Sequence, residues 1–526
     1  MTAPAASNSP HSSRAWTLFL LTGVALGLSL WAFGFSRSAD AAKTTLWWFT
    51  LGTCILALSS ARNPRVTGWV WLALTTCFAI DGATQGVIRG FFGVAPQPSV
   101  IAEALANTNS AESLGFVLEQ RHAILKGMAF ALVLITLGWK GRQLWWSRPA
   151  SRFRNLTRWA LGALTAFTVL IHFNGTMLAQ QPLLRWIVVF HRHAQAQTEI
   201  AGFEHEREKL WAQHEQWDVK LLDPQPRTVV MFIGESANAS NWQLLGYPRD
   251  TTSPLREAFA RLPGDFSLYA NARSPQAFTL PSLKLALTPA TSQSPDIWNQ
   301  TPDITFLAKA AGYHITWLSN QPSNEGWFSA IARNADTKIF INNGNWRDSS
   351  AVDSDLAAPL NKRLAEVAPA HELIVIHLLG QHFHYAQRCP PDIAPFKGID
   401  NDSVMQAMKA AGRSASTRQS RNDYDNAVYC GSQAVAQLLD TLYQARQQRA
   451  ISAFYFSDHG QEVGHNRDFS GHSEEEESGH TIPAWTWNYR PGQTTKPLEI
   501  NTRPYSLDTA DQTMQALLHI RSRWSP

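Results

Sequence analysis

Long apolar runs dominate the first third of the chain. Five of them approach the roughly 20 residues that a helix needs to cross a bilayer, and they cover about residues 15–35, 44–61, 67–92, 123–139 and 159–178. One such run can be the core helix of a soluble protein, but five in succession are typical of a membrane domain. The pattern therefore predicts an α-helical membrane domain with five transmembrane helices within residues 1–180.

Short apolar runs replace the long ones after residue 224. Runs rich in Ile, Val, Phe, Tyr or Trp predict strands at 228–233, 314–318, 338–342, 373–379 and 451–456, and helical patterns lie between them at 303–311, 355–367 and 424–447. This alternation predicts an α/β domain with a parallel sheet over residues 224–526. The polar, Ser- and Arg-rich stretch 400–422 is expected to be an exposed loop or insertion.

The stretch 181–223 joins these two domains. Its part from Leu183 to Trp217 mixes apolar residues with many His, Glu, Gln and Arg residues, and it is expected to be helical. Two alternatives remain for it, an amphipathic helix along the membrane surface or a soluble connecting helix. Pro224 and Pro226 mark the start of the globular domain.

Charge excludes one class of partner and orients the membrane domain. The net charge of +4 is small and scattered, so nucleic-acid binding is not expected. The loop between the fourth and fifth apolar runs is basic and holds no acid, which places it in the cytoplasm. With a cytoplasmic N-terminus and five spans, the α/β domain lies outside the cytoplasm. The basic residues of that loop are Lys140, Arg142, Arg148, Arg152, Arg154 and Arg158.

The four cysteines fit this arrangement. Cys54 and Cys77 lie in apolar runs and are expected to be packing residues. Cys389 and Cys430 lie in the exported half, where an oxidising compartment permits a disulfide between them.

Hard metal ligands follow two of the predicted strands. The run that ends at Phe456 is followed by Ser457-Asp458-His459-Gly460, and the run that ends at Ile233 is followed by Gly234-Glu235-Ser236. Open α/β sheets bind ligands at the carboxyl ends of their strands, and zinc accepts carboxylate oxygen and imidazole nitrogen. Glu235, Asp458 and His459 are therefore predicted to form a metal site suited to phosphate-ester chemistry. Further histidines follow the strands at His382, His384, His465, His472 and His480.

These motifs together resemble the bacterial phosphoethanolamine transferases, which are inner-membrane members of the alkaline-phosphatase/sulfatase superfamily. Gly234-Glu235-Ser236 with the downstream stretch Leu245–Thr252, which contains Gly-Tyr-Pro-Arg, is similar to the family's first motif, and Ser457–Gly460 to its second. His377–His382 and Asp423–Asn426 resemble two further family segments. The resemblance covers nearly the whole chain and implies a sulfatase-like, alkaline-phosphatase-like catalytic domain in the periplasm.

The resemblance leaves two candidates for the nucleophile. The family uses a threonine about forty residues beyond the glutamate ligand. Alignment of Thr279-Leu280-Pro281 with the family segment places Ser274 at that position, which keeps the hydroxyl group but not the methyl group. Thr279 has the usual residue type at a different offset. Ser274 is the preferred candidate, and Thr279 is the alternative.

Roles for the remaining residues come from the same resemblance. Glu235, Ser274, Asp458 and His459 would bind a catalytic Zn²⁺. His382 and His472 would hold the phosphate or a second metal and assist proton transfer, with His480 as an outer candidate or a loop-positioning residue. Thr108 and Glu112 lie in a segment that would contact the ethanolamine head group, where a carboxylate suits an ammonium group; an ordinary helix cap is the alternative.

The implied reaction is a two-step transfer of phosphoethanolamine from phosphatidylethanolamine to lipid A, the lipopolysaccharide core or another glycan. It would pass through a phosphoethanolamine-serine intermediate. A phosphoglycerol transferase of the lipoteichoic-acid-synthase type is the nearest alternative, and a membrane-tethered scaffold or sensor is an alternative of another class. Sulfatase activity is not expected, because Ser274-Pro275-Gln276 lacks the Cys/Ser-x-Pro-x-Arg pattern.

Overall fold

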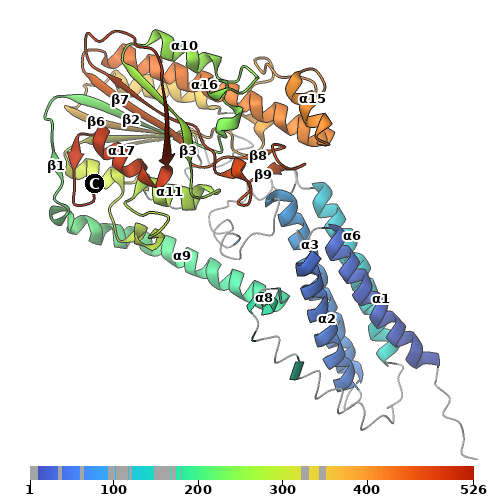
Figure 1. Ribbon diagram of the computed structural model, residues 1–526. Helices are drawn as coiled ribbons and strands as arrows, with labels where there is room; N and C mark the ends of the chain where they lie inside the picture. Colours follow the sequence, from blue (N-terminus) through green and yellow to red (C-terminus); the bar gives the residue numbers. More distant parts are fainter. Residues whose placement is uncertain are drawn as a thin grey trace, which may run out of the picture. The chain divides into compact units, whose positions relative to one another are not determined.

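The chain forms two compact units in the computed structural model, and the division falls after Gln197, within helix α9 (Pro182–Ala212) (Figure 1). The structure describes residues 10–33, 38–59, 64–92, 121–146, 175–178, 180–321, 331–342 and 351–525, with a few single residues between them. Each unit is described by itself below.

The first unit consists of long apolar helices. Helices α1 (Pro10–Phe33), α2 (Ser38–Ser59), α3 (Pro64–Phe92) and α6 (Arg121–Trp146) coincide with the first four predicted spans. Two stretches, Arg65–Ile88 and Arg121–Gln143, are long and apolar enough to cross a membrane, and Thr17–Phe33 is a shorter apolar helix. The predicted span at 159–178 lies almost wholly outside the described residues, so five spans remain a prediction; the short helix α8 (Gly175–Leu178) is described at its end.

A buried ion pair joins two helices of the first unit. Arg185 at the start of α9 donates two hydrogen bonds from Nη1 to the carboxylate of Asp81 in α3, at 3.0 and 2.8 Å. The indole of Trp186 donates a third hydrogen bond to the same carboxylate at 3.0 Å. A buried charge is tolerated when it is paired and hydrogen-bonded, so this polar pair fixes the start of α9 against α3.

An eight-stranded sheet forms the centre of the second unit. Its strand order is β11-β3-β10-β7-β2-β6-β4-β5. Five adjacent strands are parallel, namely β7 (Ala450–Ser457), β2 (Arg227–Gly234), β6 (His371–His377), β4 (His314–Ser319) and β5 (Thr337–Phe340). Every residue of β2 is buried, as expected for a central strand covered on both faces. These five strands are the five that the apolar runs predict.

Helices cover both faces of the sheet (Figure 1). On one face α10 (Ser253–Arg261) and α14 (Ala357–Leu364) pack against the long α16 (Ala415–Arg446). On the other face α11 (Thr279–Leu287) and α12 (Ile304–Ala310) pack against α17 (Ala510–Leu517). The three helical patterns predicted from the sequence correspond to α12, α14 and α16. The prediction of an α/β domain is therefore confirmed.

Three strands on one side of the sheet are absent from the sequence prediction. They are β3 (Asp265–Arg273), β10 (Ala484–Tyr489) and β11 (Glu499–Ser506). Strand β10 runs antiparallel to both of its neighbours, β3 and β7, so the sheet is mixed rather than wholly parallel. Strands β3 and β11 are only partly buried and lack a continuous apolar run, which is why they escape a search for apolar runs.

The prediction of an exposed loop at 400–422 is wrong. It contains helix α15 (Ser403–Ala410) and the first two turns of α16. Asp402 caps α15 by accepting a hydrogen bond from the Met405 backbone, and Ser414 caps α16 by accepting one from Thr417. Buried hydrogen bonds of Arg421 and Asn422 to backbone carbonyls explain why polar residues lie inside a helix here.

The predicted disulfide is present. Cys389 and Cys430 are bonded, with their Cα atoms 5.4 Å apart, and the bond joins the segment after β6 to the middle of α16. Cys54 and Cys77, both in apolar helices of the first unit, are free.

Asp511 makes the stability of the second unit depend on pH. This residue of α17 is 1% exposed, and its Oδ1 has no hydrogen-bond partner among the described residues. Burial raises the pKa of its carboxyl from 3.8 to about 7. As the pH rises, the unfolded chain loses this proton at a lower pH than the folded chain does. The bound proton therefore stabilises the folded state below about pH 4, and this stabilisation is lost between about pH 4 and about pH 7.

Replacing Asp511 with asparagine is expected to remove this dependence. The variant should be more stable than the wild type by on the order of 4 kcal/mol at pH 8, where the wild-type carboxylate is charged, and by clearly less at pH 5. Thermal unfolding of both proteins at the two pH values tests this. Equal differences in Tm at pH 5 and pH 8 would contradict it.

Candidate metal centre

Two neighbouring parallel strands bring the predicted ligands together at one edge of the sheet. Gly234 at the end of β2 pairs with Ser457 at the end of β7. Glu235 therefore emerges beside Asp458 and His459, and one ligand atom from each of these three lies within 4.8 Å of the others. All three side chains are buried. We call these three residues the ligand triad; the strand-end pattern of the sequence predicts this cluster.

Hydrogen bonds orient each member of the triad. The backbone N–H groups of Ser236 and His459 donate to Asp458 Oδ1 at 3.0 and 2.8 Å. His459 Nδ1 lies 2.7 Å from the Gly460 carbonyl, so Nδ1 carries a proton and Nε2 is the ring nitrogen that faces the two carboxylates. His459 Nε2 lies 3.4 Å from Glu235 Oε1 and 3.5 Å from Asp458 Oδ2. Three ligand atoms thus converge on one point.

The donor set fits a zinc ion. Asp458 Oδ2 is buried and has no hydrogen-bond partner among the described residues. Such an oxygen costs free energy unless a proton or a cation neutralises it. Two carboxylates and one imidazole are ligands that zinc accepts, and three protein ligands with a further position are typical of catalytic zinc sites.

Electrostatics in the triad also favour a cation. Burial and the negative charge of Glu235 raise the pKa of Asp458 to about 7. Burial alone would lower the pKa of His459, but the charges of Asp458 and Glu235 raise it to about 9. Burial likewise opposes ionisation of Glu235, yet the hydrogen bond and charge of His459 lower its pKa below the usual range. The two acids share one small buried space, which a divalent cation would stabilise.

Thr279 contacts the triad. Its Oγ1 lies 3.4 and 3.3 Å from the two oxygens of Glu235 and 3.2 Å from His459 Nε2. Thr279 is the first residue of α11, and the N-cap residue Phe278 gives no side-chain hydrogen bond to the first turn. The N–H groups at this helix start therefore suit an anionic ligand. The Thr279 hydroxyl group and this helix start lie at the same place.

Ser274, the preferred candidate of the sequence alignment, has other partners. Its Oγ lies 3.0 Å from Ser282 Oγ and 3.4 Å from the Gln276 backbone nitrogen. Its backbone N–H donates to the His480 carbonyl at 2.8 Å. Among the described residues it makes no hydrogen bond with the triad. The structure thus corrects the assignment: Thr279, and not Ser274, is the hydroxyl residue at the ligands.

His472 packs against a member of the triad, and His382 lies within electrostatic range of it. The His472 ring centroid is 4.8 Å from that of His459 and 5.6 Å from that of Phe278. His382 follows β6 and feels the charges of Glu235 and His459. Burial lowers the pKa of His382 to about 4 and that of His472 well below its usual value. Both imidazoles are therefore neutral near pH 7.

His480 has a structural position. Its Nδ1 lies 3.0 Å from the Ser274 carbonyl and its Nε2 lies 3.0 Å from the Glu474 carbonyl. Both ring nitrogens thus face backbone oxygens, which supports the loop-positioning alternative rather than substrate binding. Thr108 and Glu112, the expected head-group contacts, lie outside the described residues, so their role remains a prediction.

Two buried residues that shape the His382 loop were not predicted from the sequence. Asp353 accepts hydrogen bonds from the backbone N–H groups of Leu379 and Gly380 at 2.8 and 2.9 Å. Arg388 donates to the His382 carbonyl at 3.1 Å. Gly380 has a φ of +51°, and an added Cβ would lie 2.7 Å from the Glu235 carbonyl oxygen. Glycine is required here because the loop passes directly over the backbone of a ligand.

A buried polar network joins the Gly-Tyr-Pro-Arg segment to the segment Asp423–Asn426. Asp425 accepts hydrogen bonds from the Tyr247 hydroxyl and Arg249 Nη1, both at 2.7 Å, and from Asn241 Nδ2 at 2.7 Å. Arg249 also pairs with Asp402 at 2.6 Å. The Gly-Tyr-Pro-Arg segment is thus fixed to α16.

Comparison with known proteins identifies relatives of the second unit. A family model described as Sulfatase matches residues 227–520. Phosphoethanolamine transferase EptC of Escherichia coli strain K12 is 31% identical over 293 residues, which cover 54% of this chain and 49% of that protein. Phosphoethanolamine transferase CptA of Salmonella typhimurium is 31% identical over 283 residues, 52% of this chain and 47% of that protein. The chain therefore spans about half the length of the curated relatives it matches.

Solved structures agree with this grouping. The C-terminal periplasmic domain of EptC from Escherichia coli, solved in complex with Zn, is 29% identical with a TM-score of 0.53 and covers 58% of this chain and 86% of that domain. The integral membrane protein lipooligosaccharide phosphoethanolamine transferase A from Neisseria meningitidis shares the fold, with a TM-score of 0.58 at 19% identity over 99% of this chain and 97% of that one. Because the Sulfatase model matches more than half of its residues, this chain belongs to the sulfatase family.

Proposed function

We propose that this chain is a zinc-dependent phosphoethanolamine transferase. It moves phosphoethanolamine from phosphatidylethanolamine to lipid A, the lipopolysaccharide core or another glycan, through a covalent intermediate on Thr279. The observation that carries this proposal is the position of the Thr279 hydroxyl between Glu235 and His459 at the start of α11. The names of the EptC and CptA relatives supply the group that is transferred.

Glu235, Asp458 and His459 would hold the zinc ion, with Thr279 as a fourth ligand. When bound there, zinc supplies a Lewis acid that lowers the pKa of the threonine hydroxyl and stabilises charge on phosphoryl oxygens. The N–H groups at the start of α11 bind the same oxygens from a second direction.

In the first step, Thr279 Oγ1 attacks the phosphorus atom of the donor. The Oγ1–phosphorus bond forms while the bond from phosphorus to the glycerol oxygen breaks, so diacylglycerol leaves. The threonine proton moves to the departing oxygen through a neutral histidine, for which His382 and His472 are placed. The product is phosphoethanolamine-threonine.

In the second step, an acceptor hydroxyl or phosphate oxygen attacks the same phosphorus. The bond from phosphorus to Oγ1 breaks, and the proton of the acceptor hydroxyl, or of a singly protonated acceptor phosphate, returns to Thr279 through the same histidine. This histidine thus acts first as base and then as acid in each step of the double displacement. Sulfate-ester hydrolysis is not proposed, because the chain lacks the formylglycine pattern in the segment around Ser274.

The first unit suits a lipid donor. Its two long apolar stretches are able to cross a bilayer, and basic residues such as Lys140 place one end of the fourth helix in the cytoplasm. We therefore place the protein in a bacterial inner membrane as a multi-pass protein with its catalytic unit in the periplasm. An oxidising compartment is consistent with the Cys389–Cys430 disulfide.

Transfer from labelled lipids tests the proposal. The purified full-length protein is incubated in mixed vesicles with phosphatidylethanolamine or phosphatidylglycerol, each labelled in its head group. The expected result is label on the protein and on added lipopolysaccharide from the ethanolamine lipid alone. Label from phosphatidylglycerol alone would assign the protein to the phosphoglycerol transferases instead, and no label from either lipid would contradict a transferase. Mass spectrometry of lipid A, core oligosaccharide and glycans from cells with and without the protein then identifies the acceptor.

A further inference from the structure

A short hairpin presents His472 to the ligand triad. Strands β8 (Glu462–Val463) and β9 (Ser470–Gly471) are antiparallel, with Glu462 paired to Gly471, and His472 is the next residue. The centroid of the His472 ring lies 4.8 Å from that of the His459 ring. The position of this ring therefore depends on how the hairpin is held.

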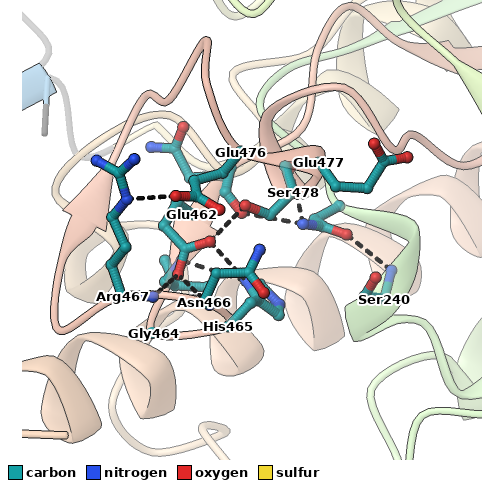
Figure 2. Close-up of polar contacts among 12 residues, drawn as sticks. Ser240, Glu462, Gly464, His465, Asn466, Arg467, Glu476, Glu477 and Ser478 are labelled. Carbon is teal, nitrogen blue, oxygen red and sulfur yellow. Dashed lines mark hydrogen bonds and ion pairs between the residues drawn. The ribbon is translucent and has the colours of Figure 1, made fainter. Parts of the chain in front are cut away.

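The Glu462 carboxylate contacts the hairpin and the segment that follows His472 (Figure 2). Its Oε1 accepts hydrogen bonds from the backbone N–H groups of Asn466 at 3.0 Å and Arg467 at 3.5 Å, in the turn of the hairpin. Its Oε2 accepts one from the Ser478 hydroxyl, beyond His472. His465 Nδ1 lies 3.8 Å from the same Oε2. One fully buried carboxylate thus joins chain segments on both sides of His472.

Further contacts connect this carboxylate to the loop of Glu235. Asn238, three residues after Glu235, donates from Nδ2 to the carbonyls of Ser478 at 2.9 Å and Gln461 at 3.0 Å. Gly479 packs so closely that an added Cβ would lie 1.8 Å from the Ser473 carbonyl oxygen. The contacts therefore run without a break from the metal-ligand loop, through Ser478, to Glu462 and the hairpin.

We propose that Glu462 is a positioning residue that fixes His472 over the ligand triad. Its carboxylate does not contact the triad; it holds the hairpin turn and Ser478 in the arrangement that places the imidazole. The kinetic consequence of this role rests on the transfer reaction proposed above, whereas the structural consequence does not. Residues that hold a catalytic group in place in this way typically change rates by 10–100-fold, about the effect of outer contacts around metal sites.

A double-mutant cycle tests the kinetic part. Glu462→Ala is expected to lower kcat for transfer by about 10–100-fold, with KM for the lipid donor changed by less than about two-fold, because the lost contact affects the proton-transfer group and not lipid binding. In a His472→Ala background the same change should cost less than about two-fold, since its target is gone. A full loss in both backgrounds would overturn the proposal.

Two variants serve as controls for this cycle. Glu462→Gln should restore most of the activity, because its amide oxygen still accepts from Asn466 and the Ser478 hydroxyl is able to accept from its amide nitrogen. Glu475→Ala removes an exposed glutamate of the same segment that pairs with Arg467 at 3.0 Å, and it should leave kcat unchanged. Equal losses for Glu462→Gln and Glu462→Ala would count against positioning by hydrogen bonds.

Hydrogen–deuterium exchange tests the structural part without any reaction. Glu462→Ala should speed exchange in peptides from 464–478 while β2, β6 and β7 keep the wild-type rates and the zinc content is unchanged. Unchanged exchange in 464–478 would overturn the proposal even if the protein transfers another group. If Glu462→Ala speeds exchange throughout the sheet, Ser478→Ala, which removes one of the hydrogen bonds to Glu462, takes its place with the same expected outcomes. If the wild type has no transfer activity, the proposed function is refuted. The exchange experiment then still decides whether Glu462 holds the hairpin in place.

Discussion

Replacing Thr279 with alanine is expected to abolish transfer, with at least a 10³-fold loss of kcat, on the order of losses seen when a nucleophile is removed. The hydroxyl is the group that lies between Glu235 and His459, so the variant has no oxygen to form the covalent intermediate. The measurement is head-group transfer from labelled phosphatidylethanolamine, together with mass spectrometry of the peptide that contains residue 279. The labelled peptide should disappear in the variant.

Ser274→Ala is the matched control, because it removes a hydroxyl from the same segment. Ser274 Oγ is bonded to Ser282 and not to the triad, so this variant should keep at least about half of the wild-type kcat, with a stability loss of about 1 kcal/mol for one hydrogen bond. Thr279→Ser should keep measurable activity, since the oxygen remains. Full activity of Thr279→Ala together with an inactive Ser274→Ala would show that Ser274 is the nucleophile, as the sequence alignment indicates.

Loss of zinc is the second large effect that we expect, from Asp458→Asn. The asparagine oxygen still accepts the N–H groups of Ser236 and His459 at the Oδ1 position. Its amide nitrogen then occupies the place of Oδ2 and carries no lone pair for a metal. The zinc content should fall from about one ion per protein molecule to below about 0.1, because the site loses a charged ligand. Transfer activity should fall with it.

Elemental analysis of the purified full-length proteins checks this prediction. Treatment of the wild type with a chelator should remove the ion and the activity, and added zinc should restore both. His480→Ala is the matched control: both of its ring nitrogens face backbone carbonyls, so its zinc content should equal that of the wild type. Normal zinc in Asp458→Asn, or an activity that survives complete removal of the metal, would exclude the proposed site.

The fold was predictable where a strand is rich in apolar residues. Strands β2, β4, β6 and β7 are almost wholly buried, and the partly exposed edge strand β5 was found from its Ile and Phe residues. Strand β11 is mostly exposed and β3 is partly buried, so neither has a continuous apolar run. The stretch 400–422 was misassigned because its helices place Arg421 and Asn422 inside the fold, where partners distant in sequence satisfy them. Polar composition alone indicates a loop.

The sequence by itself determined the ligand triad. Glu235, Asp458 and His459 directly follow buried parallel strands, and the carboxyl ends of adjacent parallel strands share one edge of a sheet. That rule is local, so it needs only the end of an apolar run and the residue types after it. The pairing of Cys389 with Cys430 was likewise available from the sequence as a hypothesis, because residues 181–526 contain no other cysteine.

Only the tertiary structure decided which hydroxyl group meets the ligands. Ser274 follows β3, which is separated from β7 by β10. With strands about 4.8 Å apart, the end of β3 lies roughly 10 Å across the sheet from the end of β7. The chain needs the next few residues to return to the ligands, and it reaches them at Thr279, where α11 begins. An alignment counts residues along the chain, whereas the distance to the metal site depends on the strand order, which no local pattern records.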